Sequence, residues 1–84
     1  MAKADRYATL LAKATANAAS LKFDELETLA LGYGYRHVRT KGSHAMYAHP
    51  EARLMNFQDD KGSAKVYQVK QLLSAIEEFN LKCE

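Results

Sequence analysis

The sequence predicts an α+β domain in which helices pack on one face of a small antiparallel sheet. Apolar residues recur at helical spacing near both ends of the chain, and strand-forming residues dominate the middle. Between two of the extended runs, Gly42-Ser43 has the composition of a two-residue hairpin turn. The predicted order is helix, helix, three strands, helix. The chain has 84 residues, which is room for one compact domain. Within this domain, residues 1–20 are predicted to form an N-terminal helix that precedes the main fold, and residues 21–84 are predicted to form the main fold itself.

Three stretches have the apolar repeat of an amphipathic helix. The first lies within the alanine-rich residues 1–19, and a break is expected at 17–20. The second spans 23–31 and stops at Gly32, and the last spans 65–79. The apolar stripes consist of Tyr7, Leu10, Leu11, Ala14 and Ala18; of Phe23, Leu26, Leu29 and Ala30; and of Val69, Leu72, Leu73, Ile76 and Phe79.

The strands are predicted over 35–41, from the hairpin turn to 48, and over 53–58. In the third strand, Met55 and Phe57 share one side, while Leu54, Asn56 and Gln58 share the other. Residues 59–63 are polar and are predicted to form a loop.

The Gly42-Ser43 turn also predicts the register of the hairpin. It places Lys41 opposite His44, Arg39 opposite Met46 and His37 opposite Ala48, all on one face. The other face then carries Thr40, Val38 and Arg36 opposite Ala45, Tyr47 and His49. Val38, Ala45 and Tyr47 are the better core residues, so the face with His37, Arg39, Lys41 and His44 is expected to point away from the helices.

The charge of the chain is unevenly distributed. The formal net charge is only +2, but residues 28–50 contain no Asp or Glu and include all three histidines with Arg36, Arg39 and Lys41. Acidic residues gather in the helical segments. A locally positive surface around the hairpin is therefore predicted.

Composition also limits the class of protein. Cys83 is the only cysteine, so an internal disulfide and a zinc site with paired cysteines are excluded. Asp5, Arg6 and Lys13 interrupt the N-terminal apolar residues, so neither a secretory signal nor a membrane span is expected. A cytoplasmic protein without metal or other cofactor is predicted. A zinc site from His37, His44 and His49 is disfavoured, because the register sends His49 to the opposite face.

The run Gly42-Ser43-His44-Ala45-Met46-Tyr47 follows a short amphipathic helix that ends in glycine. This arrangement resembles the HicA family of toxins from toxin–antitoxin pairs, over about residues 22–80. The resemblance implies an α-β-β-β-α core like the double-stranded RNA-binding domain, here with one extra helix before it. It also implies cleavage of mRNA with His44 as the catalytic residue, and a HicB-like antitoxin that covers the site.

The residues themselves suit that activity. An imidazole titrates near neutral pH, so His44 is suited to accept the proton of a ribose 2′-hydroxyl without a metal ion. Many family members have a second histidine near the end of the third strand, where this chain has Asn56 and Gln58. The general acid therefore stays open between His37 and Lys41. The residues expected to contact RNA are Arg39, Lys41, Gly42, Ser43, His37 and Tyr35.

Two alternatives remain from the sequence. One is a noncatalytic RNA-binding module that uses the same basic face. The other is a protein-interaction domain whose N-terminal helix engages a partner through its apolar stripe. The oligomeric state and the cleavage preference are not predicted by the sequence.

Overall fold

The computed structural model describes residues 3–83, which form an α+β fold of three α-helices and a four-stranded antiparallel sheet. The α+β class is thus confirmed, but the sheet has one strand more than predicted. The elements, in chain order, are α1 (Lys3–Ala16), a 3-10 turn η1 (Ala18–Ser20), α2 (Phe23–Gly32), β1 (Arg36–Lys41), β2 (His44–His49), β3 (Ala52–Asp60), β4 (Ser63–Ala64) and α3 (Val66–Glu78).

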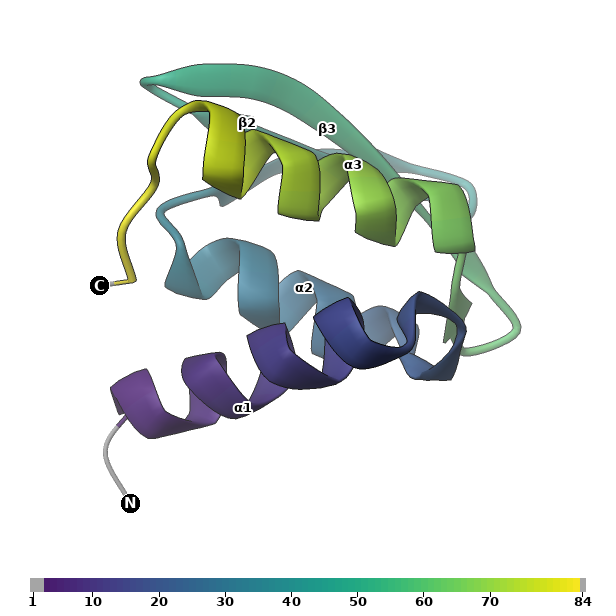
Figure 1. The fold of residues 1–84 in the computed structure, drawn as a ribbon. Coiled ribbons are helices and arrows are strands. Elements are labelled where there is room, and N and C mark those ends of the chain that lie inside the picture. The colour runs from purple at the N-terminus through teal and green to yellow at the C-terminus, as the bar shows by residue number, and fades with distance from the viewer. Residues whose placement is uncertain (1–2, 84) are drawn as a thin grey trace.

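The elements form layers, with α2 and α3 against one face of the sheet and α1 on the far side of these two helices (Figure 1). The spatial order of the strands is β1-β2-β3-β4. The core is made where the sheet meets α2 and α3, because apolar side chains from both surfaces leave water there. Its most buried large side chains include Tyr47 and Phe57 from the sheet, Leu26 and Leu29 from α2, and Val69 and Leu72 from α3.

Helix α1 completes this core. Leu10 and Ala14 are buried, and Tyr7 and Leu11 are half-buried against the same cluster. The predicted stripe is therefore occupied inside the fold, so it is not a free surface for a partner. The predicted break also appears, as Asn17 accepts a hydrogen bond from the Ala19 amide and caps η1.

The fourth strand corrects the prediction of a polar loop over 59–63. Asp59 pairs with Ala64 and Asp60 with Ser63, across a two-residue turn formed by Lys61 and Gly62. Both turn residues have positive φ, +54° and +89°, which is the geometry of a tight hairpin turn. The polar composition of residues 59–63 indicated a turn. The strand after it has only two residues, which is too short for the alternation of apolar and polar residues by which a strand is predicted.

The hairpin register is confirmed next to its turn and wrong beyond it. Lys41 pairs with His44, Thr40 with Ala45 and Arg39 with Met46, as predicted. At Val38 a β-bulge inserts one unpaired residue, so His37 lies opposite Tyr47 and Arg36 opposite Ala48. Because side chains alternate along a strand, one extra residue moves everything before it to the other face. Val38, expected in the core, is 54% exposed.

The sheet surface away from the helices is uncovered, as predicted. We call it the open face. It consists of Arg36, Arg39 and Lys41 from β1, His44, Met46 and Ala48 from β2, and Leu54, Asn56 and Gln58 from β3. Within the described residues, no helix has both the length and the apolar character needed to cross a membrane.

Candidate functional site

His44 is the first residue of β2, directly after the Gly42-Ser43 turn, and β2 lies between β1 and β3 in the sheet. Its Cα partners are Lys41 on β1 and Gln58 on β3, so a cation and an amide flank the histidine. The side chain of His44 is exposed. Among residues 3–83, no side chain or backbone group forms a hydrogen bond with its ring. The imidazole is therefore free to meet a ligand from solvent.

A hollow of about 460 Å³ lies on the open face around this histidine. Two of its residues, Met46 and Asn56, were not predicted to belong to a site, although the strand alternation does place both on this face. They form a cross-strand pair between β2 and β3. The complete lining consists of Arg39, Lys41, Gly42, His44, Met46 and Asn56.

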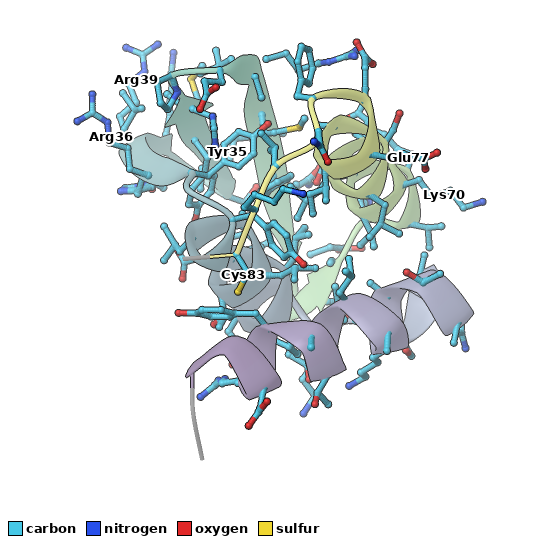
Figure 2. All side chains as sticks on the ribbon, turned by 60° about the vertical axis from the view of Figure 1, so that its left-hand side comes forward. Tyr35, Arg36, Arg39, Lys70, Glu77 and Cys83 are labelled. Carbon is cyan, nitrogen blue, oxygen red and sulfur yellow. The ribbon has the colours of Figure 1, made fainter. Side chains whose placement is uncertain are left out.

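The cations of β1 are available to a ligand. In the described part of the chain, the ion pairs join Lys13 to Glu25, Arg53 to Glu78 and Lys65 to Asp60, so none involves the β1 cations. Figure 2 shows Arg36 and Arg39 projecting from the ribbon into solvent on the same side of the molecule. An anion that approaches the open face therefore meets uncompensated positive charge.

The two residues of the hairpin turn differ in what they line, since Gly42 borders hollows on both sides of the sheet and Ser43 borders only the one on the helix side. Gly42 lines the hollow on the open face and has a φ of +61°, which suits glycine. Ser43 instead lines a second hollow on the helix side, and its carbonyl accepts a hydrogen bond of 2.8 Å from the Asp59 amide. Of the two predicted contacts, Gly42 lines the hollow with His44 and Ser43 does not.

Tyr35 was predicted to lie on the open face, and this placement is wrong. The residue precedes the bulge at Val38, so its side chain turns toward the helices and is only 3% exposed. Its hydroxyl donates a 2.9 Å hydrogen bond to the Arg53 carbonyl, and its ring packs against His49 at 5.0 Å between centroids. Burial raises the pKa of the hydroxyl. The ring is not accessible for stacking on a base.

The predicted placement of His37 on the open face is also wrong, because of the same bulge at Val38. Its ring lies 5.3 Å from that of Tyr47, and Nε2 is 2.6 Å from the Thr40 hydroxyl oxygen. His37 is therefore on the helix side of the sheet, away from His44. Of the two general-acid candidates, only Lys41 shares the hollow with the proposed base.

His49 points toward the helices, as the register predicted. Its Nε2 donates to the Tyr33 carbonyl at 3.0 Å, while Nδ1 accepts from the Glu51 amide at 3.0 Å. Both ring nitrogens are thus occupied within the fold. Over the described residues, no three His, Cys, Asp or Glu side chains are grouped so that they could hold a metal ion.

A buried polar contact that the sequence did not indicate lies beneath the hairpin. The hydroxyl of Tyr47, a fully buried side chain, donates a hydrogen bond to Oε2 of Glu27 on α2. Burial, together with the hydrogen bond and negative charge of Glu27, raises the pKa of Tyr47. This contact joins β2, the strand of His44, to α2.

The raised pKa gives a testable pH dependence. The Tyr47 hydroxyl ionises at pH ~10 in the unfolded chain and at higher pH in the folded one. Its contribution to stability is therefore complete below pH ~10 and is lost as the pH rises toward the folded pKa. We expect the free energy of unfolding, measured with urea, to fall between pH 8.5 and pH 11 by about 1 kcal/mol more in the native chain than in Tyr47→Phe.

The matched control for this experiment is Tyr67→Phe, because Tyr67 is 57% exposed. That variant should lose as much stability at pH 11 as the native chain does. Equal losses for the native chain and for Tyr47→Phe would contradict the role assigned to the buried hydroxyl.

Comparison of the chain with family models, with curated proteins and with solved structures gave no match in any of the three. A function has therefore to be inferred from the residues on the open face.

Proposed function

We propose that the chain is an endoribonuclease that binds mRNA on the open face and cleaves it without a metal ion, with His44 as the general base. One observation carries this proposal. The hairpin register places Lys41 directly opposite His44, and both line one hollow with Arg39. A group that can accept a proton thus lies beside two groups that attract phosphate.

The reaction would use these groups in a simple order. His44 removes the proton of a ribose 2′-hydroxyl, and the oxygen attacks the adjacent phosphorus. Lys41 and Arg39 stabilise the negative charge that grows on the phosphate oxygens. The bond to the 5′-oxygen breaks, Lys41 supplies the proton to that oxygen, and the products carry a 2′,3′-cyclic phosphate and a 5′-hydroxyl.

The order of elements supports the same proposal. From α2 to α3 the chain runs helix, three strands, helix, with the short β4 inserted before the last helix and α1 added in front. This is the order expected for a HicA-like toxin with a core like the double-stranded RNA-binding domain. A toxin of this kind would be kept inactive by a HicB-like antitoxin that covers the open face.

A second function is favoured by the surroundings of His44. A catalytic histidine is commonly oriented by a second group, but the described residues offer the ring no hydrogen-bond partner. The cations of β1 suffice to bind a phosphate backbone without cleavage. A noncatalytic RNA-binding module therefore remains the alternative, and loss of His44 would leave its affinity for RNA unchanged.

Both functions require RNA on the open face, which Lys41→Gln tests. Each lysine that contacts phosphate adds about 0.7 to the slope of log affinity against log salt for a single strand. We expect Lys41→Gln to reduce this slope by about that amount, measured by fluorescence anisotropy with an unstructured RNA.

The matched control is Lys70→Gln. Lys70 is exposed on α3, on the helix side of the molecule (Figure 2). This variant should keep the slope of the native chain. If Lys70→Gln lowers the slope as much as Lys41→Gln does, or if the native chain binds no RNA, the proposed interface is wrong.

A further inference from the structure

The cations of the open face all lie on a single strand. Arg36, Arg39 and Lys41 follow one another along β1, which is the edge of the sheet, over roughly 16 Å. The open-face residues of β2 and β3 include no lysine or arginine. Asp60 follows the same strand alternation as Asn56, and its negative charge is compensated by Lys65, whose Nζ lies 3.3 Å from the Asp60 carboxylate. A single line of cations can contact the phosphates of one nucleic-acid strand.

Beside this line the surface is uncharged. Met46 and Asn56 face each other across β2 and β3 in the floor of the hollow, and Leu54 next to them is 55% exposed. Met46 lies two residues from His44 on the same face, which is about 7 Å along the strand. The thioether of a methionine packs favourably against an aromatic ring, so Met46 at this distance from the reacting centre suits the flat face of an unpaired nucleobase.

Asn56 adds a polar group to that floor. The residue is exposed, and its amide has no hydrogen-bond partner among residues 3–83. A side-chain amide presents an acceptor oxygen and a donor nitrogen together, so it can pair with the edge of a base. In an RNA duplex the base faces are stacked, the Watson–Crick edges are paired, and the remaining edges line a deep, narrow major groove that side chains do not enter.

We propose that the open face takes single-stranded RNA, with the backbone along β1 and one unpaired base in the hollow against Met46, where the Asn56 amide contacts its edge. Asn56 is then a specificity-determining residue next to the cleavage site. This inference rests on the proposed function, because it requires that RNA binds the open face.

The test is binding of the native chain to short 2′-O-methyl RNA, which cannot be cleaved by attack of a 2′-hydroxyl. Fluorescence anisotropy would compare adenine, cytosine and uracil homopolymers with a duplex of the same length. We expect single strands to bind at least about tenfold more tightly than the duplex, and one homopolymer to be preferred. A good amide contact to a base corresponds to about 5- to 150-fold of discrimination between bases.

The variants separate the base contact from the backbone contact. Asn56→Ala should reduce the preference among homopolymers at least about fivefold and leave the salt dependence unchanged. Gln71→Ala, which removes an exposed amide from α3, should leave both unchanged. Lys41→Gln should reduce the salt dependence and keep the preference.

Equal affinity for duplex and single strands, or an unchanged preference in Asn56→Ala, would overturn this inference and leave the proposed function standing. Absence of any salt-dependent RNA binding by the native chain would overturn both. These two failures are thus distinguished in one set of titrations.

Discussion

Replacement of His44 by alanine is expected to lower the rate of RNA cleavage by about 10²- to 10⁴-fold, the usual contribution of a general base. The free energy of unfolding should stay within ~0.5 kcal/mol of the native value, because the His44 side chain is exposed and its ring has no hydrogen-bond partner in the described chain. Initial rates on a labelled unstructured RNA, with urea unfolding of the same samples, measure both quantities.

The matched control is His37→Ala. His37 is also exposed and also belongs to the hairpin, but it lies on the helix side, against Tyr47. Its loss should leave the cleavage rate within about twofold of the native rate, since it contributes no group to the hollow around His44. Equal losses of activity in the two variants would mean that the catalytic centre is placed incorrectly.

Replacement of Phe57 by alanine is expected to cost about 3–5 kcal/mol of stability. Phe57 is fully buried, and its ring packs 5.2 Å from that of Tyr47 at the centre of the sheet. A cavity there would remove contacts within the core cluster that β3 shares with α2 and α3. Urea unfolding monitored by circular dichroism measures the change.

Leu54→Ala on the same strand provides the comparison. Leu54 is 55% exposed on the open face, so its truncation should change the free energy of unfolding by less than ~1 kcal/mol. If Leu54→Ala is as destabilising as Phe57→Ala, the assignment of the two faces of β3 is wrong.

The helices were predictable from sequence because their signal is local and repeated. Leu10 and Ala14 in α1, Leu26 and Leu29 in α2, and Val69 and Leu72 in α3 recur at helical spacing, and all are buried. The Gly42-Ser43 turn was predictable for the same reason. Its composition determines the pairing of Lys41 with His44, and so the cationic surroundings of the proposed base.

The bulge at Val38 was not predictable, because a β-branched residue in an alternating run favours a regular strand. The reason for the bulge lies in contacts distant in sequence. With Val38 unpaired, His37 packs on Tyr47 and the Tyr35 hydroxyl reaches the Arg53 carbonyl. That single unpaired residue accounts for the wrong placement of both Tyr35 and His37.

The contact between Glu27 and Tyr47 had no signal in the sequence either. Glu27 occupies a position on an amphipathic helix where a solvated carboxylate is normal, and the two residues are 20 positions apart. Only the packing of α2 against β2 brings the hydroxyl to the carboxylate. Asn56 was overlooked for a related reason. A single asparagine on a strand is identified as a site residue only when the fold places it in the same hollow as Met46 and His44.

Metal-independent cleavage by His44 can be measured by incubating the purified native chain with a long unstructured RNA in excess EDTA and analysing the ends of the products. We expect fragments with 2′,3′-cyclic phosphate and 5′-hydroxyl ends, because attack by the 2′-oxygen leaves these groups. RNA that stays intact, or that is cut only when a divalent metal ion is supplied, would contradict a metal-independent ribonuclease centred on His44.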